Sequence, residues 1–251
     1  MSEQPEKKSK FKVVLFALIL SAICSLLITA AAVGLKDLQL ANMKIDKKYN
    51  ILRACEMVGP KKPSREEVDR LYRSHIEELL VDPEGNIIDS HKPGALSLFL
   101  VKKDGQPNGY ILPVTTRGLW GKIQGYLAFE NDGQTVAGFS VFSHSETPGL
   151  GGEIESAWFR KNFKGKKIIN AQNQFVSVGI AKGKVSDLPQ ESRPHYVDGI
   201  SGATLTGKYL SEGIRDTLVK YNPVVIRLNQ IPTKSAPSVP AGQPQPENKE
   251  H

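Results

Sequence analysis

The sequence predicts an α+β domain with a mostly antiparallel sheet, attached to a single N-terminal transmembrane helix. Three observations lead to this prediction. An uncharged apolar run covers Val13–Leu35, a helix start signal lies at Ser64–Glu67, and strand-like segments then follow one another without strict alternation with helices. Strands and helices that do not alternate are typical of α+β folds rather than of parallel α/β folds.

The run Val13–Leu35 is long enough to cross a bilayer, because spanning takes roughly 20 apolar residues at about 1.5 Å each. A cleaved signal peptide is the competing interpretation, since Ala30–Ala32 resembles a cleavage site, but signal cores hold only about 7–15 residues. Lysines at positions 7, 8, 10 and 12 favour a cytoplasmic N-terminus over residues 1–12. We therefore expect the chain beyond residue 35 to lie outside the cytoplasm, although four more lysines between residues 36 and 48 weaken the charge asymmetry.

The segment 36–60 is predicted to continue the membrane helix and to end at Gly59–Pro60, because proline removes a backbone donor and disfavours helix before it. Ser64 and Glu67 have the spacing of a capping box. Apolar residues at intervals of three and four follow as far as Leu80 and predict an amphipathic helix. The folded domain is expected to occupy residues 61–231.

Strands are predicted over Leu96–Lys102, Gly109–Val114, Ile123–Glu130 and Thr135–Phe142, with a hairpin turn at Asn131–Gly133. A short helix over Ile154–Phe163, a strand over Gln174–Ala181 and a helix over Leu205–Tyr221 complete the expected domain. Residues 232–251 are rich in Pro, Gln, Ser and Lys, and they lack the apolar side chains that offset the entropy of ordering. This tail is predicted to be disordered.

Composition excludes several classes of function. Apolar residues make up 39 % and charged residues 24 % of the 251, which is ordinary for a globular protein. The net charge of +7 forms no basic stripe, so no nucleic-acid partner is expected. The five histidines are isolated, and Cys24 in the membrane run cannot meet Cys55, so neither a metal site nor an intrachain disulfide is expected. The sequence contains no Gly-x-Gly-x-x-Gly run, the motif that indicates a dinucleotide-binding site.

The segment Ser201–Thr204, just before the last predicted helix, can hold an anion. A hydroxyl at a helix N-terminus lies beside unpaired amides and the positive end of the helix dipole, which together stabilise an attached phosphate. Gly202 and Ala203 are small enough for a bulky ligand to approach the backbone. Taken alone, the segment is explained as well by a hydroxyl that only caps the helix.

The longer run Asp-Gly-Ile-Ser-Gly-Ala-Thr at 198–204 resembles the flavinylation motif of the FMN-binding domain family. The resemblance implies that the phosphate of FMN is esterified to Thr204 and that Ser201, Gly202 and Ala203 bind the cofactor. It also implies that Asp198 is recognised by a Mg-dependent flavin transferase, which takes the FMN from FAD.

Two further segments carry the same resemblance. Residues 143–152 resemble the Glu-Thr-Pro-Gly-Leu-Gly loop of the family, which implies that the isoalloxazine ring is contacted by Glu146, Thr147, Gly149 and Leu150. The Gly-Leu-Trp segment at 118–120 implies that Trp120 lies near the ring. Lys182 matches the lysine of a lysine-glycine pair in the family and could neutralise the phosphate. The alternatives are a glycine-rich turn, core packing of Trp120 and a solvated strand end at Lys182.

The Gly-Leu-Trp segment and residues 41–52 resemble the NqrC family, the flavin-carrying C subunits of sodium-pumping NADH:quinone oxidoreductases. This resemblance implies an electron carrier in a bacterial inner membrane, with its domain in the periplasm, which passes electrons from an iron–sulfur centre to a second FMN in the NqrB subunit. The implied partners are the membrane subunits NqrB, NqrD and NqrE, the flavin transferase and the lipid bilayer. The whole complex would be an NADH:ubiquinone reductase and a sodium translocase, although this chain alone would not oxidise NADH.

Two alternatives stay open at this point. The G subunit of the Rnf electron-transport complex, RnfG, shares the anchor and the flavin motif but is less similar around residues 118–120. A non-redox periplasmic module would use Thr204 only as a helix cap. In every case sodium transport belongs to partner subunits, because one helix without an intramembrane charge cannot form an ion path.

Overall fold

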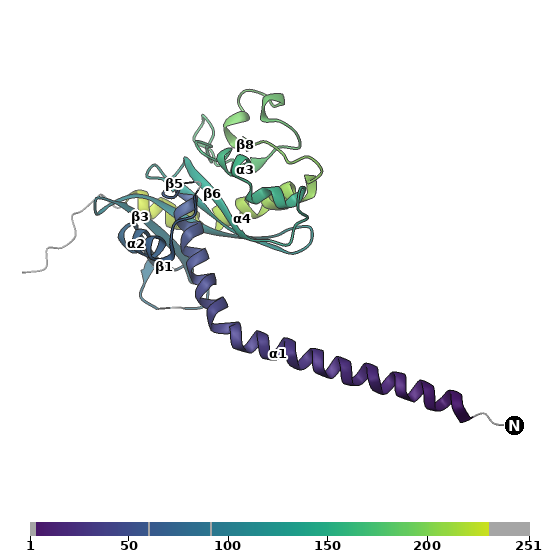
Figure 1. Ribbon diagram of the computed structural model, residues 1–251. Helices are drawn as coiled ribbons and strands as arrows, with labels where there is room; N and C mark the ends of the chain where they lie inside the picture. The colour runs from purple at the N-terminus through teal and green to yellow at the C-terminus, as the bar shows by residue number, and fades with distance from the viewer. Residues whose placement is uncertain (1–3, 60, 91, 231–251) are drawn as a thin grey trace, which may run out of the picture.

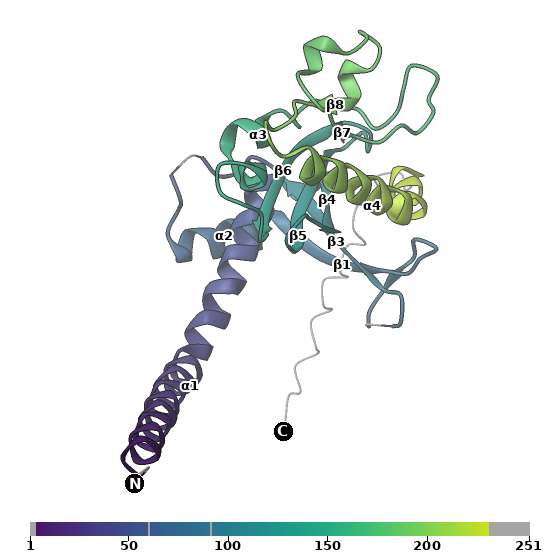
Figure 2. The same ribbon diagram turned by 90° about the vertical axis from the view of Figure 1, so that its right-hand side faces the viewer.

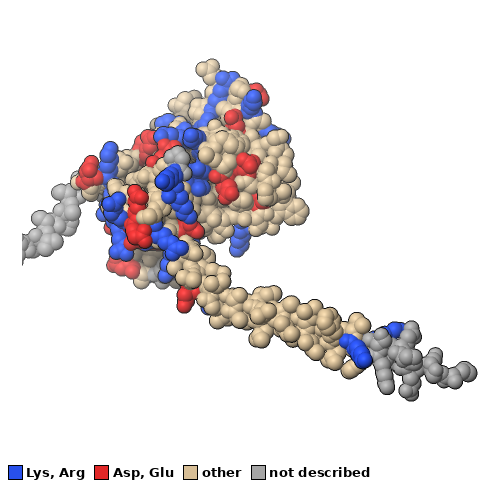
Figure 3. All heavy atoms as spheres, viewed as in Figure 1, with Lys and Arg blue, Asp and Glu red and all other residues tan. Residues whose placement is uncertain are grey.

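The computed structural model describes residues 4–59, 61–90 and 92–230. Its N-terminal helix α1 (Gln4–Ala54) extends away from a folded domain, as Figure 1 shows. The part of α1 from Lys10 to Ala54 contains a window with a mean hydropathy of 2.7 and no buried residue, which suits a membrane-spanning helix. Figure 3 shows a stretch of the rod without charged side chains between the lysines near its start and the domain.

The C-terminal turns of α1 belong to the domain, because Ile51, Leu52 and Ala54 are buried there. The helix ends at Ala54, five residues before the predicted stop at Gly59, and Pro60 lies outside the described residues. Glu56 adopts a φ of 56°, and the amide of Met57 donates to the carbonyl of Leu52 at 2.9 Å. This is the hydrogen-bond pattern of a Schellman motif, which ends the helix without a proline.

A six-stranded sheet with entirely antiparallel pairing forms the centre of the domain, in the order β2-β1-β3-β4-β5-β6. The strands are β1 (Ile76–Val81), β2 (Ile87–Ile88), β3 (Leu96–Lys103), β4 (Gln106–Arg117), β5 (Lys122–Glu130) and β6 (Val136–Ser143). A second, parallel pair joins β7 (Gly179–Ile180) to β8 (Tyr196–Val197). The predicted α+β class with a mostly antiparallel sheet is confirmed.

Helices cover both faces of the sheet (Figures 1 and 2). One face carries α4 (Thr204–Gln230) and α3 (Ala157–Lys161), and the other carries the end of α1 and α2 (Arg65–His75). Successive strand residues alternate between the two cores: Leu98 packs with the α4 side and Phe99 with the α1 side. This period of two is the expected signature of a sheet buried on both faces.

Three short 3₁₀ helices lie between β6 and α4: η1 (Gly151–Glu155), η2 (Val185–Asp187) and η3 (Arg193–His195). The predicted helix Ile154–Phe163 is therefore divided between η1 and α3, which are separated by Ser156, the N-cap of α3. Its hydroxyl accepts a hydrogen bond from the amide of Phe159.

Two further predicted elements are wrong in extent. The amphipathic helix expected to reach Leu80 ends at His75, and residues 76–81 form β1 paired with β3. The strand expected over Gln174–Ala181 is reduced to Gly179–Ile180, because residues 174–178 follow an irregular path with positive φ at Ser177. The tail 232–251, predicted to be disordered, lies outside the described residues.

Candidate functional site

Thr204 is the first residue of α4, and its side chain is exposed. Among the described residues, the amides of Thr204, Leu205 and Thr206 have no hydrogen-bond acceptor, as expected for the first turn of a helix. The preceding turn is closed by the amide of Ala203, which donates to the carbonyl of Ile200 at 3.1 Å. A free hydroxyl and three free amides therefore lie together at the positive end of a long helix.

Gly202 is required for the shape of this turn. Its φ is +73°, in a region that residues other than glycine rarely adopt. A Cβ atom there would lie 2.8 Å from Cδ2 of Leu150. The turn before α4 and the loop containing Leu150 are thus in close contact.

Glu146 joins three segments that are distant in sequence. Its side chain is only 5 % exposed. Oε1 accepts hydrogen bonds from the amides of Leu119 at 2.8 Å and Trp120 at 3.1 Å, and Oε2 accepts one from the hydroxyl of Thr206. We call this arrangement the Glu146 clamp: it ties the 118–120 segment and the first turn of α4 to the loop after β6.

The motif glycines fit closely around this clamp. A Cβ atom on Gly118 would lie 2.3 Å from Oε1 of Glu146. A Cβ atom on Gly151 would lie 2.7 Å from Oε2 of Glu146 and 2.7 Å from Oγ1 of Thr206. All three distances are far below van der Waals contact, so these two glycines leave room for the buried carboxylate.

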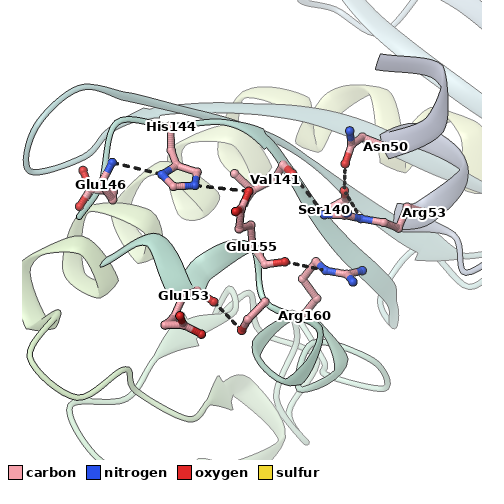
Figure 4. Close-up of polar contacts among 10 residues, drawn as sticks. Asn50, Arg53, Ser140, Val141, His144, Glu146, Glu153, Glu155 and Arg160 are labelled. Carbon is pink, nitrogen blue, oxygen red and sulfur yellow. Dashed lines mark hydrogen bonds and ion pairs between the residues drawn. The ribbon is translucent and has the colours of Figure 1, made fainter. Parts of the chain in front are cut away.

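His144 supports the backbone of the same loop. Its Nδ1 atom accepts a hydrogen bond from the amide of Glu146 at 3.1 Å, and its Nε2 atom lies 3.5 Å from Oε2 of Glu155 on η1. Figure 4 shows the imidazole between these two groups. An acceptor role at Nδ1 requires the proton to be on Nε2, which is the tautomer that can donate to Glu155.

Four large apolar side chains near the clamp are exposed to solvent. Trp120 is 69 % exposed, and Leu119, Leu150 and Leu205 are 44 % to 47 % exposed. All four come from the segments that the clamp and Gly202 hold together. Trp120 is therefore not a core residue, and an apolar ligand that covered these side chains would gain the free energy of removing them from water.

The other predicted site residues have the following positions. Thr147, Gly149 and Ser201 are exposed in the two adjoining turns, and Ala203 is buried beneath Thr204. Lys182 is exposed and lines a groove that also contains Thr204. Asp198 is half-buried, and its Oδ1 atom accepts a hydrogen bond from the amide of Val185 at 2.6 Å.

Sequence reasoning missed two of the residues that build the site. Thr206 is two residues after Thr204, which rotates it by about 200° around the helix, so it points into the protein while Thr204 points out. The role of His144 depends on tertiary contacts with Glu155, and its spacing gave no signal. Glu146 was predicted to bind the cofactor, and the structure shows both of its carboxylate oxygens engaged within the protein.

Comparison with known proteins gives the class of this site. Residues 118–219 match the family described as FMN-binding domain. The fold and the match define an FMN-binding domain carried on an N-terminal helix of membrane-spanning length.

Named relatives give the particular family. The C subunit (NqrC) of the Na(+)-translocating NADH-quinone reductase of Yersinia pestis is 32 % identical over 249 residues, which cover 86 % of this chain and 90 % of the relative. The same subunit of Pseudomonas aeruginosa is 35 % identical, with 80 % of this chain and 88 % of the relative covered. The chain belongs to the NqrC family of Na(+)-translocating NADH-quinone reductases.

Solved structures agree with this assignment. The crystal structure of the corresponding subunit from Parabacteroides distasonis is 32 % identical, has a TM-score of 0.66 and is matched over 96 % of its length and 76 % of this chain. NqrC from Shewanella oneidensis, at 21 % identity and a TM-score of 0.61, shares the fold over 75 % of this chain and 99 % of its own length.

Proposed function

We propose that the chain is an electron-carrying subunit of a sodium-translocating NADH:ubiquinone oxidoreductase, with FMN bound through a phosphoester to Thr204. The observation that carries this proposal is the exposed Thr204 hydroxyl beside three unpaired amides, in a domain that matches the FMN-binding family. A phosphate on Thr204 would be stabilised by these amides and by the helix dipole.

The residues around Thr204 suit a flat ring next to that phosphate. Leu119, Trp120 and Leu150 present exposed apolar surface, and the amide of Gly149 and the hydroxyl of Thr147 belong to the adjacent loop. When bound, the flavin supplies the one- and two-electron chemistry, and the protein supplies binding, orientation and electrostatics. The Glu146 clamp would fix the geometry of the ring-binding surface without touching the ring, and Lys182 would balance the phosphate charge.

Attachment and topology complete the proposal. A Mg-dependent flavin transferase would recognise the motif that begins at Asp198. It would transfer the FMN group of FAD to the hydroxyl of Thr204: the new phosphoester bond forms as the pyrophosphate bond of FAD breaks, the hydroxyl loses its proton, and AMP leaves. The lysines before the membrane run would hold the N-terminus in the cytoplasm and place the domain in the periplasm. There it would receive electrons from an iron–sulfur centre in the membrane subunits and pass them to the FMN of NqrB.

Flavin fluorescence on a denaturing gel tests the attachment. The full-length protein, expressed together with the transferase, should give a fluorescent band that survives denaturation. Thr204→Ala should lose the fluorescence, while Thr115→Ala, an exposed threonine on β4, serves as the matched control and should keep it. A colourless wild-type band from cells with an active transferase would show that the covalent flavin is absent.

Two further experiments test the partner subunits and the membrane topology. Affinity purification of the full-length chain from its native membrane should recover NqrB, NqrD and NqrE; recovery of a ferredoxin-linked complex would favour the Rnf assignment instead. Protease added outside spheroplasts should digest the domain that contains Trp120. Protection of the domain would mean that the topology is inverted.

A further inference from the structure

The β4–β5 hairpin carries Trp120 at its tip, and the indole ring of this residue is not held by packing. Trp120 is 69 % exposed, and its side chain takes part in no hydrogen bond or ring contact within the part of the chain that the structure describes. The position of the ring therefore depends on the backbone that carries it. Glu146 holds this backbone at one place, through the amides of Leu119 and Trp120. A turn attached at one place can still rotate about it, so a second attachment is needed to fix the ring.

The base of the same hairpin is attached to α4. The guanidinium carbon of Arg117 lies 4.0 Å from the centre of the Tyr209 ring, which is within the range of a cation–π interaction. Beside it, the hydroxyl of Thr116 donates to the backbone carbonyl of Tyr209 at 3.0 Å. Gly213 allows this approach, because a Cβ atom on it would overlap the side chain of Thr116. The hairpin is thus held at its tip by Glu146 and at its base by α4.

The ring of Tyr209 is the one side-chain partner of Arg117 among the described residues. The Arg117 side chain is exposed, and a cation–π pair at an exposed site changes an equilibrium by a factor of only about two to five. That factor is small beside the equilibrium constant for global unfolding. Local openings of a surface hairpin have much smaller free energies, so the same factor changes how often the hairpin leaves α4. The magnitude therefore favours a local role of Arg117 over a contribution to overall stability.

The geometry points to Arg117 as a positioning residue: by stacking on Tyr209 it holds the hairpin so that Trp120 lies against the bound flavin. This inference rests on the proposed function, which places the flavin ring beside Trp120 and its phosphate on Thr204. Tyr209 is five residues after Thr204 on α4, or roughly 7.5 Å along the helix. The tether and the attachment of the hairpin therefore belong to one rigid element, and Arg117 fixes the ring contact relative to the tether. Arg117 acts through Trp120 and takes part in no chemical step.

Amide hydrogen exchange of the full-length protein in detergent tests the attachment without the flavin. In the Thr204→Ala form, Arg117→Met should accelerate exchange at residues 118–119 about two- to five-fold, while the amides of β3 keep their rates. Tyr209→Leu removes the other partner and should have the same effect, and it keeps the test available if Arg117→Met does not fold. The double variant should add little to either single change, because both remove the same interaction. Arg70→Met, which removes an exposed arginine on α2, is the matched control and should leave these amides unchanged.

Trp120 fluorescence of the flavin-loaded protein tests the positioning. Trp158→Phe leaves Trp120 as the single tryptophan of the chain, and a flavin in contact with an indole quenches its emission. Fluorescence lifetimes then separate Trp120 against the flavin from Trp120 away from it. Arg117→Met should raise the ratio of unquenched to quenched Trp120 about two- to five-fold. Tyr209→Phe keeps an aromatic ring under the guanidinium and should stay close to the parent protein.

The results distinguish a failure of this inference from a failure of the proposed function. If the flavin quenches Trp120 but a folded Arg117→Met variant leaves either the exchange rates or the lifetimes unchanged, the positioning role alone is overturned. A loaded wild-type protein with the same Trp120 lifetimes as Thr204→Ala would contradict the placement of the ring and overturn the inference with it. A wild-type protein without covalent flavin would contradict the proposed function, and both would fall.

Discussion

Removal of the Glu146 carboxylate should open the clamp that holds the site together. In Glu146→Ala, the amides of Leu119 and Trp120 and the hydroxyl of Thr206 lose their common acceptor. In Glu146→Gln, the amide oxygen can still accept from both backbone groups, and the side-chain NH₂ can donate to Thr206. The two substitutions therefore separate loss of hydrogen bonds from loss of charge.

The expected magnitudes follow from the three bonds. A hydrogen bond to a charged group contributes about 1.5–3 kcal/mol, but water entering the vacated space will compensate part of this, because Leu119 and Trp120 lie at the surface. We expect Glu146→Ala to lower the free energy of unfolding by about 3 kcal/mol. Glu146→Gln keeps the bonds without the charge and should lower it by about 1 kcal/mol.

Urea unfolding of the full-length protein in detergent would measure the stability, and hydrogen exchange would locate the effect. The amides of Leu119 and Trp120 should lose protection in Glu146→Ala, whereas amides of β3 should change only with global stability. Unchanged exchange at Leu119 and Trp120 in Glu146→Ala would refute the reasoning, because it would mean that the carboxylate does not hold these amides.

Three further predictions concern stability. Gly118→Ala should cost about 2–3 kcal/mol, because its Cβ atom would meet Glu146 Oε1, while Gly59→Ala, with open space around it, is the control in the same urea assay. Ser177→Gly should stabilise the fold by about 1 kcal/mol in thermal unfolding, since it removes left-handed strain and an unpaired hydroxyl; no gain would contradict this. Burial raises the pKa of the Cys55 thiol to about 12, so the unfolded chain loses that proton at lower pH than the folded one. Stability should then fall by about 1.4 kcal/mol per pH unit above about pH 9, and Cys55→Ala should remove this part of the slope in urea titrations at about pH 8 and pH 10.

The sequence predicted most of the sheet because its strands have clear hydrophobic patterns and turn signals. The prediction failed where one hydrophobic pattern fits both a helix and a strand. Ile76, Leu79 and Leu80 have helical spacing after Val68 and Leu71, and only the pairing of β1 with β3 decides that they form a strand. The predicted strand over residues 174–181 failed for a related reason: only Gly179 and Ile180 find a partner strand.

The candidate site was predicted in its segments but not in its internal construction. The motifs implied that the loop at 146–150, the segment at 118–120 and the turn at 201–204 contact one flavin, and in the structure Glu146 and Gly202 bring these segments close together. No local signal indicated that Glu146 would be buried, because its partners are 27, 26 and 60 residues away in the chain. Contacts of that kind arise only from the complete fold.

Because α1 is unbroken, its apolar segment is rigidly connected to the folded domain. The helix runs unbroken from the apolar segment into the core, where Arg53 Nε donates to the hydroxyl of Ser140 at 3.3 Å and that hydroxyl donates to Asn50 Oδ1 at 2.7 Å. Tyr49, the first buried residue, is fourteen positions after Leu35, which corresponds to a stalk of roughly 21 Å. A single residue inserted into that stalk would swing the whole domain by about 100° around the helix axis, so the direction in which Thr204 faces a neighbouring protein is fixed by the length of a segment that contains no site residue.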